Sequence, residues 1–256
     1  MRVVAAVITA MLVMSLLGGC SGADRAAKRE QELRAAAINV QLGLNYLQAN
    51  NLDLASQKLE RALEQDPRLP AAHYAYALLQ ERIGRDELAD RHYRRAVALD
   101  PKYSDAFNAY GVFLCRKERL ADADAAFRQA LDNPLYGARE VPMTNAGICM
   151  QKGADKGKAE DYFRRALEVN PNYGPALFEM AEISFRQERY LQTRAYLQRF
   201  TETQQNSPRT LWLCVKSERA MRNWEAAGNC ALRLKNRFPD SGEAAMLHEL
   251  ESRGGN

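Results

Sequence analysis

The sequence is poor in the residue arrangements that build catalytic and metal sites. Its three histidines, His73, His92 and His248, are far apart along the chain. None has a nearby cysteine, serine or carboxylate pair at a spacing that supports nucleophilic or acid–base catalysis, and no CxxC pair offers zinc ligands. We therefore predict a protein that is not an enzyme, has no metal or cofactor, and takes no small-molecule substrate.

A strong excess of one charge is also lacking. Lysine and arginine total 36 and aspartate and glutamate total 32, a formal net charge of +4. The basic residues are spread along the chain instead of clustered, which argues against a nucleic-acid partner. Residues 153–158 faintly resemble a phosphate-binding loop, but the spacing is wrong and the stretch follows a predicted helix. We interpret this stretch as a turn between two helices.

The apolar run at the N-terminus is too short to span a membrane, which needs about 20 residues. It occupies residues 3–17, follows Arg2 and leads into Leu17-Gly18-Gly19-Cys20. A charged start, a short apolar run and small residues before a cleavage point are typical of a secretory signal peptide. The last four residues resemble the bacterial lipobox, which implies cleavage before Cys20 and lipid attachment to it.

The lipobox resemblance sets an expectation for location. We assign residues 1–19 to a lipoprotein signal peptide and 20–35 to a lipidated tether. Two or more acyl chains hold a protein stably on a membrane. Because Ser21 and not aspartate follows the lipidated cysteine, we expect an outer-membrane lipoprotein on the periplasmic face. An ordinary signal peptide with a chance cysteine is the alternative.

What the sequence does contain is a repeat of 34 residues. In residues 36–69 its frame holds Gly43, Ala55, Leu59 and Pro67, and the frame recurs in the following stretches. Small residues let two antiparallel helices approach closely, Leu59 fills the space beside them, and proline ends the second helix. This spacing is the signature of the tetratricopeptide (TPR) repeat, a helical hairpin that buries its apolar face only by stacking on its neighbours.

The frame predicts an all-α fold, a right-handed α-solenoid of about six TPR hairpins. The fifth repeat is degenerate, because Thr193 and Phe200 replace the expected alanines. A short helix near the C-terminus should cover the last apolar face. The predicted repeats are residues 36–69, 70–103, 104–137, 140–173, 174–207 and 208–241, followed by a capping helix and tail in residues 242–256.

Four cysteines remain once Cys20 is assigned to the lipid. Cys115 and Cys149 lie one repeat apart on the first helices of repeats three and four, and Cys214 and Cys230 lie on the two helices of repeat six. Because the periplasm is oxidising, we predict the disulfides Cys115–Cys149 and Cys214–Cys230. The sequence itself allows three pairings, and buried free thiols are the alternative.

The concave face of the stack is the predicted binding surface. In TPR geometry, positions two, five, nine and twelve of each first helix face inward, and in the N-terminal repeats these are mostly apolar. An apolar groove favours a helix or an extended apolar segment of a partner protein. Alternatively, Val40, Leu44 and Leu78 pack between repeats or lie under the N-terminal helix. The predicted groove residues are Val40, Leu44, Leu47, Tyr74, Leu78, Asn108, Val112 and Ile148.

The lipobox, the six repeats and the cysteine placement together resemble one family, the PilF/PilW lipoproteins of type IV pilus biogenesis. The most suggestive stretches are residues 110–115 and 145–149, which end in Cys115 and Cys149 and flank a long loop. The resemblance implies a pilotin, which binds the secretin subunit of the type IV pilus machine and promotes its outer-membrane localisation and multimerisation. A lipid-anchored TPR adaptor that recruits or regulates periplasmic cell-wall enzymes is the alternative.

Overall fold

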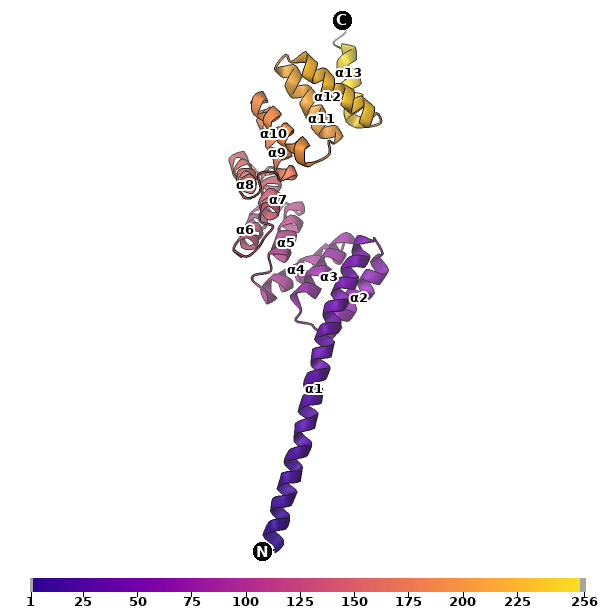
Figure 1. Ribbon diagram of the computed structural model, residues 1–256, viewed down its shortest axis with the longest axis vertical. Helices are drawn as coiled ribbons and strands as arrows, with labels where there is room; N and C mark the ends of the chain where they lie inside the picture. The colour runs from indigo at the N-terminus through magenta and orange to yellow at the C-terminus, as the bar shows by residue number, and fades with distance from the viewer. Residues whose placement is uncertain (1, 254–256) are drawn as a thin grey trace. The chain divides into compact units, whose positions relative to one another are not determined.

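The structure is a computed structural model that describes the backbone of residues 2–253 and the side chains of residues 24–202 and 204–253. All regular secondary structure in this described part is helical (Figure 1). The helices are α1 (Arg2–Gln48), α2 (Leu52–Gln65), α3 (Pro70–Arg82), α4 (Asp86–Leu99), α5 (Ser104–Arg116), α6 (Leu120–Leu131), α7 (Glu140–Met150), α8 (Lys156–Val169), α9 (Gly174–Arg186), α10 (Tyr190–Thr203), α11 (Pro208–Ala220), α12 (Trp224–Arg237) and α13 (Gly242–Arg253).

Consecutive helices pack as hairpins, which confirms the predicted TPR fold. The pairs α1–α2, α3–α4, α7–α8, α9–α10 and α11–α12 are in contact. Neighbouring hairpins such as α1–α2 and α3–α4 contact one another mainly through the second helix of one and the first helix of the next. The chain divides into two compact units, Met1–Tyr110 and Gly111–Asn256, with the boundary inside α5. We call these two parts unit 1 and unit 2.

Glycine at the eighth repeat position allows the two helices of a hairpin to touch. A Cβ atom on Gly111 would lie 2.7 Å from the ring of Phe127, and one on Gly147 would lie 2.6 Å from the ring of Phe163. Both phenylalanines are completely buried. Rings of this size fill the hairpin interior only because the facing helix has no side chain at that point.

The turn between the two helices of a hairpin uses a left-handed residue. Residues Asn50, Gly84, Glu118, Glu188 and Arg222 have φ between 56° and 77°. The amide of the following residue donates to a carbonyl five residues earlier, for example Asn51 to Tyr46. This hydrogen bond closes the end of the first helix, as in a Schellman motif.

The C-terminal helix α13 covers the last hairpin, as the repeat frame predicts. Ala244 and Leu247 of α13 are at most 1% exposed and pack with Leu211 and Leu234 of α11 and α12. Without α13, that apolar surface of α11 and α12 would face water, so α13 acts as the cap that a repeat stack requires.

Helix α1 continues well upstream of the first predicted repeat. Within the stretch assigned to a tether, Arg29 donates to the carbonyl of Gln65 at 3.2 Å and lies 3.6 Å from the carboxylate of Asp66. This part of α1 is therefore held against the end of α2. The predicted signal peptide, residues 1–19, and Cys20, the predicted site of lipid attachment, lie outside the residues whose side chains are described.

Within the described residues, no helix combines the length and the apolar character that a membrane crossing requires.

Candidate partner-binding surfaces

The apolar groove residues predicted in unit 1 lie on α1 and α3. These two helices are in contact and share one hydrophobic core. Val40 is 6% exposed and packs with Leu59 and Leu79 in that core. The side chain of Val40 is therefore part of the core and is not accessible to a partner.

Four of the predicted residues form what we call the apolar face of unit 1: Leu44, Leu47, Tyr74 and Leu78. All four are half-buried, and Leu44 and Leu47 pack on the core beneath them. The ring of Tyr74 meets the ring of Tyr103 edge-on, with centroids 5.4 Å apart. Burial, assisted by the charge of Asp105, raises the pKa of Tyr74, so the phenol is neutral at physiological pH and can both donate and accept a hydrogen bond.

The other three predicted groove residues divide between the two units. Asn108 is half-buried on the part of α5 that belongs to unit 1. Val112 and Ile148 belong to unit 2, where Val112 is half-buried and Ile148 is 43% exposed. Ile148 is therefore the most accessible apolar side chain of the predicted set.

Two exposed apolar residues were missed by the groove prediction. Ile38 and Leu42 of α1 are 61% and 36% exposed. Thirty-four residues later, Tyr76 occupies the place of Leu42 and reaches Glu60 of the preceding α2 at 3.5 Å. One repeat further, Tyr110 donates to Asp90 of the preceding α4 at 2.9 Å.

This comparison explains why Ile38 and Leu42 are exposed. The repeat position of Leu42 packs against the hairpin before it, whereas within the described residues only the continuous helix α1 precedes the first repeat. Ile38 and Leu42, four residues apart on one side of α1, therefore form the open apolar end of the repeat stack, on the side of α1 opposite Leu44 and Leu47. The 34-residue spacing contains the signal, because it shows which positions face the preceding repeat.

The two histidines of unit 1 are packed together instead of standing apart. The Nδ1 atoms of His73 and His92 are 3.0 Å apart, and Nε2 of His73 lies 3.0 Å from the carbonyl oxygen of Pro67. Burial lowers the pKa of His73, and burial together with the charge of His73 lowers the pKa of His92 to about 4. Both rings are therefore neutral at neutral pH, with one Nδ1 donating to the other. Among the described residues, no group of three or more His, Cys, Asp or Glu side chains is placed to hold a metal ion.

Unit 2 contains both predicted disulfides. One joins Cys115 of α5 to Cys149 of α7, with Cα atoms 5.7 Å apart, and so links the helices on either side of the long loop. The other joins Cys214 of α11 to Cys230 of α12, with Cα atoms 6.1 Å apart. Each disulfide covalently fixes the contact between two helices of unit 2.

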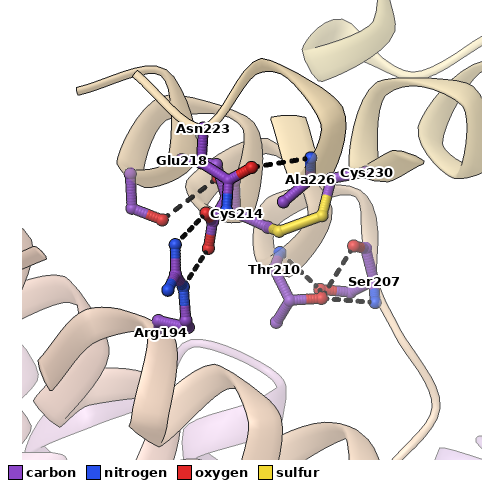
Figure 2. Close-up of a disulfide and its surroundings, with 9 residues drawn as sticks. Arg194, Ser207, Thr210, Cys214, Glu218, Asn223, Ala226 and Cys230 are labelled. Carbon is purple, nitrogen blue, oxygen red and sulfur yellow. Dashed lines mark hydrogen bonds and ion pairs between the residues drawn. A yellow bond between two sulfur atoms is a disulfide. The ribbon is translucent and has the colours of Figure 1, made fainter. Parts of the chain in front are cut away.

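The Cys214–Cys230 disulfide lines a cavity of about 400 Å³ between α10, α11 and α12. Figure 2 shows the polar groups around the disulfide. Arg194 of α10 binds the buried Glu218 of α11 through two contacts, of 2.7 and 2.5 Å. Ser207 and Thr210 form a capping box at the start of α11. These contacts hold α10 and α11 together, and we interpret the cavity as part of the packing between hairpins.

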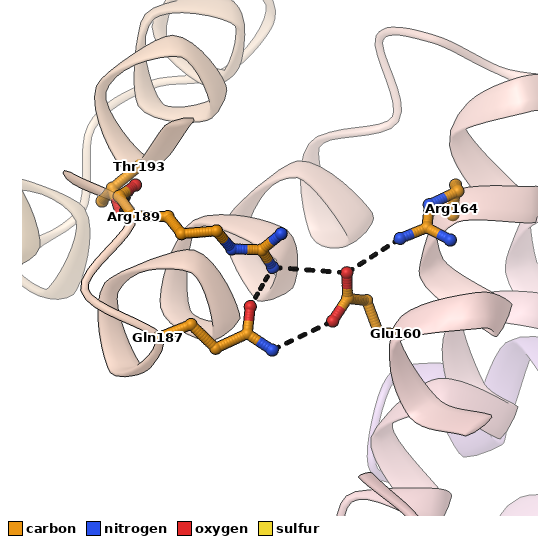
Figure 3. A network of polar contacts seen from close by, with 5 residues as sticks. All are labelled: Glu160, Arg164, Gln187, Arg189 and Thr193. Atoms are coloured by element: carbon orange, nitrogen blue, oxygen red, sulfur yellow. Dashed lines mark hydrogen bonds and ion pairs between the residues drawn. The ribbon is translucent and has the colours of Figure 1, made fainter. Parts of the chain in front are cut away.

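A second polar cluster connects α8 to the turn between α9 and α10 (Figure 3). The carboxylate of Glu160 accepts hydrogen bonds from Arg164 at 2.8 Å, Arg189 at 3.3 Å and Gln187 at 3.1 Å. Arg189 also donates to Gln187. Because the carboxylate of Glu160 on α8 binds both residues of the turn between α9 and α10, we interpret the cluster as orienting repeats four and five relative to each other.

Comparisons with known proteins agree with the observed fold and indicate the family of the chain. Residues 40–103 match the tetratricopeptide repeat family. The type IV pilus assembly protein PilF of Pseudomonas aeruginosa is 30% identical over 242 residues, which cover 93% of this chain and 95% of that protein.

Two solved structures are similar to this chain over most of its length. The structure of Pseudomonas aeruginosa PilF superposes with a TM-score of 0.77 at 29% identity, covering 87% of this chain and 99% of that one. The structure of PilW, a widely conserved type IV pilus biogenesis factor, gives a TM-score of 0.74 at 28% identity, covering 83% and 97%. This chain therefore belongs to the PilF/PilW family of type IV pilus assembly proteins.

Proposed function

We propose that this protein is a pilotin, a lipoprotein that binds the secretin subunit of the type IV pilus machine and promotes its outer-membrane localisation and multimerisation. The observation that carries the proposal is the apolar face of unit 1, four half-buried side chains on the contacting helices α1 and α3. A surface of this kind fits an apolar segment of a partner.

The lipid has a separate role in this proposal. Acyl chains on Cys20 would supply the membrane address, while the repeats hold the client protein. Replacing Cys20 with alanine should leave secretin binding by the purified protein unchanged and should abolish outer-membrane localisation. Finding the intact leader on the protein in cells would contradict the lipoprotein assignment.

The test of the pilotin function is deletion of the gene, followed by gel analysis of secretin from heated and unheated membranes. We expect secretin multimers to be lost from the outer membrane and to return when the wild-type gene is restored. Normal multimers in the deletion strain would overturn the proposal.

The same strains separate the pilotin from the second candidate function, an adaptor for periplasmic cell-wall enzymes. A pull-down from membranes with the tagged full-length protein should enrich the secretin. Enrichment of cell-wall hydrolases without the secretin would favour the adaptor.

A further inference from the structure

A second surface of different chemistry lies on α9 and α11 of unit 2, the first helices of two neighbouring hairpins, which are in contact. The guanidinium of Arg209 on α11 lies 4.7 Å from the ring centre of Phe178 on α9. The ammonium of Lys216 lies 4.7 Å from the ring of Phe185 and 5.9 Å from that of Trp212. Cations of one helix therefore rest on aromatic rings of both.

The pattern continues at the end of α11. The guanidinium of Arg219 lies 5.4 Å from the ring of Trp224, and the Trp224 side chain is 60% exposed. We call the six residues Phe178, Phe185, Arg209, Trp212, Lys216 and Arg219 the basic–aromatic strip. In the 34-residue frame, these are six of the eight predicted groove-facing positions of repeats five and six; the other two are Pro175 and Glu182.

The rings of the strip are anchored while its cations remain accessible. Phe178 and Phe185 are half-buried and pack on the core of Ala181, Leu197 and Leu213. The side chain of Arg209, in contrast, is 65% exposed. A cation held over a ring keeps its hydrogen-bonding edge directed outward, so little side-chain freedom is lost when a carboxylate binds.

The negative charge near the strip does not balance its positive charge. Glu182 is the acidic group facing it, and its carboxylate lies 3.9 Å from both Arg209 and Arg186. Within the described part of the chain, Lys216 and Arg219 have no ion-pair partner. Glu218, although adjacent in sequence, is buried and bound to Arg194.

We propose that the basic–aromatic strip binds an acidic segment of a partner protein, one that also carries an apolar side chain. The carboxylates would pair with Arg209, Lys216 and Arg219, which lie on one face of α11, about two turns and one turn apart. The apolar side chain would pack on Trp224, since exposed tryptophan and arginine are the residue types that dominate binding interfaces. This surface is distinct from the apolar face of unit 1 and does not depend on the pilotin function.

Random peptides displayed on phage are selected for binding to the full-length protein. Peptides that also bind the double variant Arg209→Glu, Lys216→Glu are then removed by counter-selection. We expect the selected peptides to be enriched in aspartate and glutamate together with aromatic or aliphatic residues. Their affinity should fall at least about tenfold in the variant and should weaken as salt is raised. Peptides without acidic bias would overturn the proposal.

A matched control separates the strip from a general charge effect. Arg233 and Arg237 are exposed on α12, and the double variant Arg233→Glu, Arg237→Glu changes the net charge by the same amount. The control should bind the selected peptides within about twofold of wild type. Equal weakening in both variants would contradict a specific site.

Two further measurements test whether the variant is folded and whether the strip binds an anionic lipid surface instead. If the glutamate variant does not fold, as judged by thermal unfolding, the neutral variant Arg209→Gln, Lys216→Gln takes its place with the same expected direction. Vesicles of phosphatidylglycerol serve as the other anionic surface. Binding to vesicles that is lost in the strip variant, with no binding of acidic peptides, would replace the proposed partner with a lipid surface.

Discussion

Gly43 of α1 lies directly against Leu59 of α2, and a Cβ atom at Gly43 would come within 2.5 Å of two Leu59 side-chain carbons. Leu59 is completely buried and cannot move aside. This contact is the interior of the first hairpin. The same relationship between a glycine and a large side chain recurs in the third and fourth hairpins.

Replacing Gly43 with alanine should therefore destabilise unit 1, because the added methyl group overpacks the contact with Leu59. We expect a loss of about 1–3 kcal/mol in the free energy of unfolding, measured by urea denaturation. Gly228 of α12 is the matched control, since a Cβ there would meet nothing within 4 Å. Gly228→Ala should be neutral or stabilising by up to about 1 kcal/mol, because alanine favours the helix.

The hairpin turns provide a second prediction. Gly84 and Glu188 have φ of 77° and 58° at equivalent turns, a region that glycine adopts without strain. Gly84→Ala should lower stability and Glu188→Gly should raise it, each by about 1 kcal/mol. Changes of the same sign in the two urea midpoints would contradict the left-handed assignment.

A third prediction concerns pH and the histidine pair. The pKa of His92 in the folded state, about 4, lies below the ordinary value of 6.5. Between these two values the unfolded chain binds more protons than the folded chain, so stability falls as pH is lowered through this window. The contribution is roughly 1–2 kcal/mol, reduced from the full shift because the ring is partly exposed to solvent.

The variant His92→Gln removes this titration while its amide can still pair with His73. Its stability, measured by urea denaturation at pH 7.5 and pH 4.5, should change less with pH than that of the wild type. The control is His248→Gln on the exposed side of α13. Parallel pH dependences for wild type and His92→Gln would exclude a role for the pair.

Asp124 of α6 gives a fourth prediction, because it ties α6 to α8. Its side chain is 6% exposed and its carboxylate lies 2.8 Å from the ammonium of Lys158 and 2.8 Å from the hydroxyl of Tyr162. Burial alone raises the pKa of Asp124, but hydrogen bonds from Lys158 and Tyr162, with the charges of Lys158 and Arg128, outweigh it and lower the pKa.

Replacing Asp124 with asparagine should cost about 1–3 kcal/mol of stability at pH 7, because the buried hydroxyl of Tyr162 loses a charged acceptor and Lys158 loses its ion pair. The depressed pKa means that the stabilising contribution is present above the ordinary value of 3.8 and is lost as the pH falls below it. Asp161 is the control: it lies 3.8 Å from Arg165 with both side chains exposed. Asp161→Asn should change stability by less than about 1 kcal/mol.

Much of the fold could be predicted from the sequence, because the 34-residue repeat determines which helices pair. The repeat frame places Gly43 opposite Leu59, brings Cys115 and Cys149 onto neighbouring first helices, and identifies α13 as a cap. Each of these follows from one repeat of 34 residues, with no need to know how distant parts of the chain are arranged.

The features that could not be predicted depend on side-chain size and on turn conformation. Val40 occupies a groove position in the frame, yet its short side chain is buried in the core. The left-handed turn residues include Glu118 and Arg222, where no glycine marks the turn. His73 and His92 are far apart along the chain, yet His92 packs between His73 and Tyr76.

The central claim is that the apolar face of unit 1 captures the secretin. The most direct test is the affinity of the purified full-length protein for the secretin in two matched variants, Leu78→Glu on the apolar face and Leu135→Glu in unit 2. Leu135 is 90% exposed in the loop before α7, so a charge there should be tolerated. Thermal unfolding of each variant reports whether the fold is kept.

We predict that Leu78→Glu weakens secretin binding at least about tenfold, a change of about 1.4 kcal/mol, while its thermal unfolding stays close to that of the wild type and Leu135→Glu binds normally. Unchanged binding by a folded Leu78→Glu variant, or equal loss in both variants, would contradict the claim.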